Sequence, residues 1–125
     1  MSKPKLITRF TVYGEPASKA NSRKLVTNKR TGKPMFIKSS KARRYVMDFQ
    51  IQCRPLEPLI EDDVLVKMTI YYASRRPDLD ESVILDAMQG YIYKNDRQVK
   101  HKDICWGLDR ENPRADIEIS LICQK

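Results

Sequence analysis

Residues Arg75 to Val99 read RRPDLDESVILDAMQGYIYKNDRQV, and they concentrate acidic side chains within a chain that is basic overall. Mg²⁺ binds oxygen ligands, often only one or two carboxylates together with waters and a substrate phosphate. The acids therefore form a candidate metal site, although a solvated acidic turn that caps a helix explains the local pattern equally well. The acidic residues of the stretch are Asp78, Asp80, Glu81, Asp86 and Asp96.

The segment that leads into these acids, residues 63–72, alternates in apolar character and predicts a β-strand. A short helix is expected over residues 81–89, ending at Gly90. The acids thus fall where a strand ends and a helix begins. In an extended segment Asp78 and Asp80 point to the same side, because side chains alternate with a period of two. Two carboxylates placed in this way can converge on one cation.

The first part of the chain predicts a strand, a basic loop and a hairpin. β-Branched and aromatic residues indicate a strand over residues 6–13. The polar loop 17–24 is a candidate grip for phosphate groups, and a solvated surface loop is the alternative. Residues 25–27 and 34–37 flank a basic segment with Gly32 near its end, which is typical of a two-stranded hairpin.

A helix is expected to begin at Ser39 or Ser40 and to run to about Cys53. Its apolar residues recur at helical spacing on one face, which indicates a side that packs in the core rather than a platform for stacking bases. These residues are Ala42, Tyr45, Val46, Phe49 and Cys53.

The last part of the chain predicts two more strands. Residues 91–93 suggest a short extended piece, residues 94–97 a turn, and residues 98–106 a strand. Residues 115–123 alternate and predict a final half-exposed strand. Together these elements predict an α+β fold, in which residues 1–125 form a single domain with a mixed, hairpin-rich β-sheet and two helices packed on it.

The charge of the chain is unevenly distributed. Its formal net charge is +8, but residues 1–50 hold 13 Lys/Arg against 2 Asp/Glu, while residues 51–125 hold 11 against 14. The basic half creates a positive field that attracts nucleic acid or another anionic surface. No apolar run is long enough to cross a membrane, and no signal peptide precedes the first strand, so a cytosolic location is expected.

Histidine and cysteine give little support to other chemistry. The chain has one histidine and 3 cysteines, with no closely spaced cysteine pair, so a structural zinc site and a disulfide scaffold are both disfavoured. Each cysteine is expected to be a small buried apolar residue. They are Cys53, Cys105 and Cys123.

The order of motifs in the central stretch resembles the RusA family of Holliday-junction resolvases, which are small phage or prophage endonucleases. The pattern is carried by Pro77-Asp78-Leu79-Asp80, Asp86-Ala87-Met88, Gly90, the aromatic pair Tyr91 and Tyr93, Asn95-Asp96 and Gln98-Val99. The opening strand that runs into Gly14-Glu15-Pro16 and a basic loop is similar as well. The likeness spans most of the chain, but its specific part is residues 75–99.

The resemblance implies a homodimer that binds four-way DNA junctions and cuts them symmetrically with Mg²⁺ or Mn²⁺. It implies no membrane and no small-molecule cofactor, and it suits the cytoplasm of a bacterium or of a phage-infected host. The implied catalytic acids are Asp78, Asp80 and Asp96. These three are also the implied metal ligands, with Glu81 and Asp86 as further candidates. The candidate DNA-binding residues are Lys19, Arg23, Lys24, Arg43, Arg44, Arg75, Arg76, Lys94 and Arg97.

Three positions depart from the family pattern. Glu81 and Asn95 stand where the family has Asn and Asp, and Ile84 stands where it has a lysine one helical turn after the second Asp. The interval from Asp80 to Asp86 is also about two residues shorter, which is about 200° of helix. Lys94, Arg97 or Arg76 can replace the lysine in space, the protein can cut slowly, or it can bind junctions without cutting.

Two other functions therefore stand beside the resolvase. One is a RusA-like junction-binding protein with weak or no cleavage. The other is an α+β domain that binds RNA or protein and carries a chance acidic turn.

Overall fold

A four-stranded mixed sheet forms the centre of the fold, in the order β1-β6-β4-β5. The computed structural model describes residues 5–17 and 23–122. Within the sheet β4 and β5 are parallel, whereas β6 runs antiparallel to both β1 and β4. The strands are β1 (Lys5–Tyr13), β4 (Val64–Tyr72), β5 (Val99–Leu108) and β6 (Arg114–Leu121).

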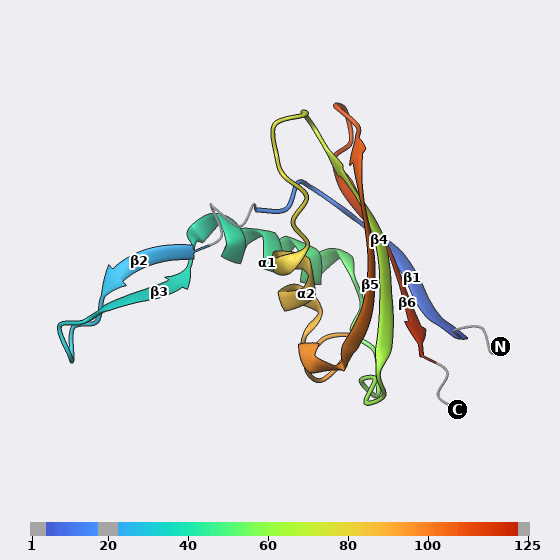
Figure 1. Ribbon diagram of the computed structural model, residues 1–125, viewed down its shortest axis with the longest axis horizontal. Coiled ribbons are helices and arrows are strands. Elements are labelled where there is room, and N and C mark those ends of the chain that lie inside the picture. The colour runs from blue at the N-terminus through green and yellow to red at the C-terminus, as the bar shows by residue number, and fades with distance from the viewer. Residues whose placement is uncertain (1–4, 18–22, 123–125) are drawn as a thin grey trace.

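The parallel pair requires a crossover, because two parallel strands cannot be joined by a tight turn. The chain between β4 and β5 makes this crossover and contains helix α2 (Ser82–Met88). Figure 1 shows α2 and the longer helix α1 (Ser40–Gln52) lying on the same face of the sheet. The acidic stretch is therefore part of the crossover, and it lies between a strand and a helix as the sequence predicted.

The core lies between the helices and this face of the sheet. Alternate residues of β4 are buried from one end of the strand to the other, as its sequence pattern predicted. On the helix side Phe49 is fully buried, and its ring meets that of Phe10 edge to face at a centroid distance of 5.9 Å. The buried residues of β4 are Val64, Val66, Met68, Ile70 and Tyr72.

Helix α1 forms where the sequence predicted it. The side chain of Ser39 accepts a hydrogen bond from the Ala42 N–H, which satisfies one of the free donors at the helix start. Cys53 ends the helix, and its N–H donates to the carbonyl of Phe49 at 3.0 Å. Of the expected apolar face, Val46 is partly buried and the rest is in the core.

Strands β2 (Arg23–Thr27) and β3 (Pro34–Lys38) form the predicted hairpin, but as a separate two-stranded sheet. Figure 1 shows it projecting from the start of α1, away from the main sheet. Gly32 adopts a φ of +71° in its turn, which an L side chain rarely takes. Within the described residues this is the one hairpin between consecutive paired strands, so the expected hairpin-rich sheet is instead built from longer connections.

Residues 90–92 form a turn, and Tyr93 makes isolated β-bridges to Ile60 and Gln89, so the extended piece predicted over residues 91–93 is confined to Tyr93. The N–H groups of Tyr91 and Ile92 donate to the carbonyl of Met88, so they hold the chain in a tight turn directly after α2. Gly90 supports this turn with a φ of +78°. The hydroxyl of Tyr93 then donates to the carbonyl of Leu85 at 2.8 Å.

The remaining differences from the sequence predictions are small. The turn expected over residues 94–97 includes the start of a short 3₁₀-helix, Asp96–Gln98. Cys53 is buried as expected, but Cys105 is exposed on edge strand β5, so that prediction is wrong. Cys123 lies outside the described residues. No helix in the described part of the chain is long and apolar enough to span a membrane.

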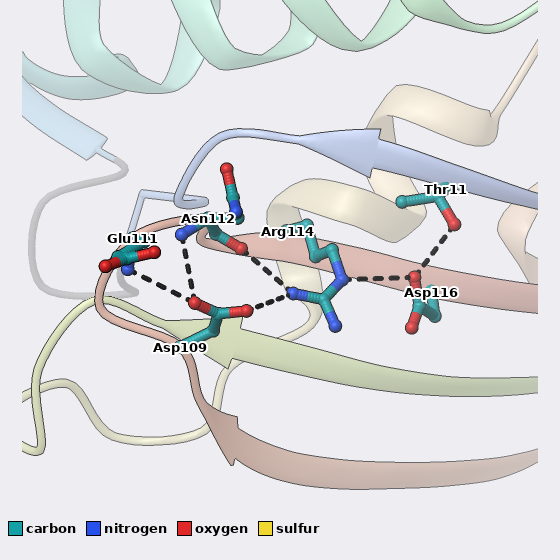
Figure 2. A network of polar contacts seen from close by, with 6 residues as sticks. All are labelled: Thr11, Asp109, Glu111, Asn112, Arg114 and Asp116. Atoms are coloured by element: carbon teal, nitrogen blue, oxygen red, sulfur yellow. Dashed lines mark hydrogen bonds and ion pairs between the residues drawn. The ribbon is translucent and has the colours of Figure 1, made fainter.

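A polar network fixes the turn between β5 and β6 (Figure 2). Asp109 accepts the N–H groups of Glu111 and Asn112, and also the Nη1 of Arg114 at 2.6 Å. The hydrogen bonds from Asn112 and Arg114 hold the pKa of the Asp109 carboxyl below its usual value. The Arg114 guanidinium lies 4.0 Å from the centre of the Tyr71 ring. These contacts direct β6 back between β1 and β4.

Ile84 stands where the RusA pattern has a lysine, and in this fold that position lies in the hydrophobic core. Ile84 is 0% exposed in α2 and packs in the core. We predict that Ile84→Lys lowers the free energy of unfolding by on the order of 3–5 kcal/mol, because it buries an uncompensated charge. Urea unfolding followed by circular dichroism measures the change.

Ile51→Lys is the matched control, because it introduces the same side chain at a helical position that is 81% exposed. It is expected to leave the unfolding midpoint nearly unchanged. Equal stability of the two variants would contradict the placement of Ile84 in the core.

Candidate active site

The acidic segment, residues 77–81, lies along β5, the outer strand of the sheet. The indole Nε1 of Trp106 donates to the Pro77 carbonyl at 3.1 Å. Nearer the start of the same strand, the Nζ of Lys102 lies 2.8 Å from Oε2 of Glu81. The segment therefore passes β5 in the direction opposite to the strand.

The register of the sheet shows which face of β5 this segment occupies. Lys102 and Trp106 pair with Val66 and Ile70 of β4, whose side chains are buried on the helix-covered side. Paired residues of neighbouring strands point to the same face. The acidic segment is thus held on the face that carries α1 and α2.

Tyr72 anchors the segment from β4. Its hydroxyl accepts a hydrogen bond from the Asp80 N–H at 3.2 Å, and its ring stacks on that of Trp106 at a centroid distance of 5.8 Å. Burial raises the pKa of the Tyr72 hydroxyl, the hydrogen bond from Asp80 opposes this, and the carboxylates of Asp80, Glu15 and Glu81 raise it further. Three carboxylates therefore lie close enough to the Tyr72 hydroxyl to raise its pKa, near the N-terminal end of α2.

Asp80 is the best-positioned carboxylate in this group. Its Oδ1 accepts hydrogen bonds from the N–H and the hydroxyl of Ser82, at 3.0 and 2.7 Å. Its Oδ2 is buried and has no hydrogen-bond partner among the described residues. A buried carboxylate oxygen without a donor is unfavourable, and a bound cation is one of the arrangements that would satisfy it. The donor chemistry of Asp80 therefore fits a divalent metal ion.

A second group of acids surrounds Tyr93. Burial raises the pKa of its hydroxyl, and the carboxylates of Asp96 and Asp86 raise it further. The N–H of Asp96 donates to the Oε1 of Gln89 at 2.9 Å, which joins the 3₁₀-helix to the end of α2. Asn95 caps this 3₁₀-helix with its side chain, so the residue that departs from the family pattern has a structural role.

The structure does not gather the predicted metal ligands into one preformed cage. Across residues 5–17 and 23–122, no three Asp, Glu, His or Cys side chains are arranged to hold a metal ion. The carboxylates of Asp80 and Glu81 raise the pKa of the Tyr72 hydroxyl, whereas those of Asp86 and Asp96 raise the pKa of the Tyr93 hydroxyl. Asp78 is exposed on the segment itself.

The predicted DNA-binding residues occupy several surfaces. Arg75 and Arg76 are exposed in the loop that connects β4 to the acidic segment, and Lys24 is exposed on the hairpin. Lys94 is engaged in an ion pair with Glu61, which lowers the pKa of that carboxyl. Arg43, Arg44 and Arg97 are exposed on α1 and the 3₁₀-helix. Lys19 and the side chain of Arg23 lie outside the described residues.

Three residues that the sequence did not single out hold this site together: Tyr72, Trp106 and Lys102. Tyr72 was detectable, because it continues the buried alternation of β4. Trp106 and Lys102 depend on the parallel pairing of β4 with β5, which no local pattern specifies. The position of Lys102 beside Glu81 therefore could not be predicted from the sequence and is seen only in the folded structure.

A chain with its positive charge concentrated in one half carries the electrostatic footprint of a nucleic-acid-binding protein. Residues 14–120 match the family Endodeoxyribonuclease RusA, so the chain belongs to this family. Membership implies an endonuclease that resolves Holliday junctions, which are branched DNA formed in recombination. A comparison with curated proteins gave no match.

The hydroxyl of Tyr72 is predicted to hold the acidic segment in place. Tyr72→Phe removes the acceptor of the Asp80 N–H, and we expect it to lower the free energy of unfolding by about 1 kcal/mol. Hydrogen exchange at the Asp80 amide should become faster in the variant, because this hydrogen bond protects it.

Tyr71→Phe is the control, because Tyr71 neighbours Tyr72 and its side chain lies on the opposite face of β4. Unchanged exchange at Asp80 in Tyr72→Phe, relative to this control, would refute the anchoring role.

Proposed function

We propose that this protein is a Mg²⁺-dependent endodeoxyribonuclease that resolves four-way DNA junctions by paired symmetric nicks. The observation that carries the proposal is Asp80, which has one carboxylate oxygen fixed by Ser82 and the other buried without a partner among the described residues. In a chain of the RusA family, this is the arrangement expected of a metal ligand beside a phosphodiester.

Asp78 and Asp80 would hold the metal ion, with waters and the DNA phosphate as the other ligands. This set suits Mg²⁺, which is often bound by only one or two carboxylates, and Mn²⁺ is expected to substitute. Asp96 is the third proposed catalytic acid, and Glu81 and Asp86 are further candidate ligands. When bound, the metal neutralises charge on the phosphate and lowers the pKa of a coordinated water.

DNA would be held largely by the N-terminal half of the chain. Residues 16–47 contain ten Lys/Arg and no Asp/Glu, and they include the projecting hairpin and the first two turns of α1. Such a segment meets a phosphate backbone without repulsion and releases counterions when it binds. The basic residues of this segment are Lys19, Arg23, Lys24, Lys29, Arg30, Lys33, Lys38, Lys41, Arg43 and Arg44.

A homodimer follows from the symmetry of the substrate. A four-way junction has two-fold symmetry, so two symmetric nicks in one pair of opposite strands require two active sites related by a two-fold axis. We propose that two copies of this chain supply them. The proposed location is the cytoplasm of a bacterium or of a phage-infected host, where such junctions arise.

A second function, junction binding without cleavage, is favoured by one specific observation. Ile84 occupies the position of the family's lysine and is fully buried, so this helix offers no cation to the phosphate. Tight, salt-sensitive binding without any metal-dependent nick would support this function over the first.

The nuclease proposal predicts that Asp80→Asn abolishes cleavage. The amide keeps the shape of the side chain but loses the charge that holds the metal, so we expect the rate to fall by more than about 100-fold. Junction affinity should be unchanged or tighter, because a charge that repels phosphate is removed. Cleavage and gel-shift assays on the same junction separate the two effects.

Asp103→Asn is the matched control for this variant. Asp103 is exposed on β5 and pairs with the exposed Lys67, on the face opposite to the acidic segment. Cleavage by Asp80→Asn at the wild-type rate, or an equal loss of cleavage in Asp80→Asn and Asp103→Asn, would refute the assignment of Asp80 as a catalytic acid.

The hairpin is predicted to contribute to the salt dependence of binding. Replacing Lys29, Arg30 and Lys33 by alanine removes three exposed charges near its turn. The slope of log K against log salt is negative, and it should become less negative by about 0.9 for each phosphate that the variant no longer neutralises. Lys67→Ala, on the open face of the sheet, should leave the slope unchanged, and an unchanged slope in the triple variant would exclude the hairpin from the DNA interface.

A further inference from the structure

Lys102 is a cation placed inside the acidic site by the fold. Its Nζ lies 2.8 Å from Oε2 of Glu81, the residue that follows Asp80 in the chain. The Lys102 side chain keeps 46% of its surface exposed, whereas that of Glu81 keeps 21%. The ammonium is therefore tethered at the site and still open to solvent.

Lys102 also lies between the two groups of acids. Strand β5 begins at Val99, directly after the 3₁₀-helix that contains Asp96. At about 3.3 Å per residue, Lys102 lies about 10 Å along the strand from Val99 and about 13 Å from Trp106, which binds the segment at Pro77. A phosphate bound beside Asp80 and Glu81 would therefore lie close to this side chain.

Two other sources of a cation are less suited to this position among the described residues. Helix α2, with the sequence SVILDAM, contains no Lys or Arg, and Lys94 is paired with Glu61. Among the ion pairs within the described residues, the one that reaches residues 77–81 is that of Lys102 with Glu81.

A purely structural ion pair is the alternative explanation. Exposed pairs contribute about 0–1 kcal/mol to stability, so stability gives little reason to place a lysine here. An ammonium carries three donors, and the bond to Glu81 uses one of them. The other donors remain available to a phosphate oxygen.

We propose that Lys102 is a catalytic residue that binds the scissile phosphate, and that Glu81 is the positioning residue that holds it there. The inference rests on the proposed nuclease function. Nζ keeps its proton and donates hydrogen bonds to a non-bridging phosphate oxygen. These bonds strengthen as negative charge grows on that oxygen during attack by water, so the interaction favours the transition state over the bound substrate.

The test compares Lys102→Met and Lys102→Arg with the wild type in single-turnover cleavage of a four-way junction in Mg²⁺. We expect Lys102→Met to slow cleavage by about 30-fold or more while the junction Kd in EDTA changes by less than about threefold. Lys102→Arg should recover part of the rate, because it keeps the charge but changes its geometry. Lys67→Met, an exposed lysine on the opposite face of neighbouring β4, should cleave at the wild-type rate.

Glu81→Gln distinguishes positioning from ligation. If Glu81 only positions Lys102, its variant should slow cleavage less than Lys102→Met does, and the double variant should be no slower than Lys102→Met alone. Unfolding midpoints measured in parallel establish that each variant is folded.

If Lys102→Met cleaves at the wild-type rate while Asp80→Asn does not cleave, the role of Lys102 is overturned and the nuclease function stands. A rate loss that Lys102→Arg does not relieve, together with an equal loss of affinity, would make Lys102 a structural residue. No cleavage by the wild type in either Mg²⁺ or Mn²⁺ would overturn the proposed function itself, and the inference with it.

Discussion

The contact on which the site depends is the packing of the acidic segment against Tyr72 and Trp106. The Tyr72 hydroxyl accepts the Asp80 N–H, and the Trp106 indole binds the Pro77 carbonyl while the two rings stack. Both aromatic residues are brought together by the parallel pairing of β4 and β5. The crossover that such pairing demands is the same chain segment that carries the acids, so the topology and the site have one origin.

The electrostatics of the molecule divide along the same lines. A basic N-terminal half supplies the attraction for phosphate, and the carboxylates that would hold a cation lie on the chain between β4 and β5. Among the described residues these carboxylates form two groups, around Tyr72 and around Tyr93, rather than one closed cage. A site that is open in this way leaves coordination positions for water and for the substrate phosphate, which is how Mg²⁺ is usually bound.

The sequence pattern predicted those helices and strands that are determined by interactions between residues close together in the chain. Strand β4 was evident from its alternation, and α1 from its apolar spacing and its cap at Ser39. Strand order, the separate hairpin and the turn after Gly90 were not predictable, because they depend on long-range pairing and on hydrogen bonds to Met88. The same limit applies to the candidate site, where motif order points to Asp80 but only the register of β5 reveals Lys102.

Cleavage of a mobile four-way junction by the wild-type protein, with both pairs of strands mapped at nucleotide resolution, tests the proposed nuclease site most directly. Paired cuts are expected at symmetric positions near the crossover, with 5′-phosphate ends, in Mg²⁺ or Mn²⁺ and none in EDTA. Cleavage that persists without metal, or tight binding with no cuts in either metal, would show that these acids do not form a metal-dependent nuclease site.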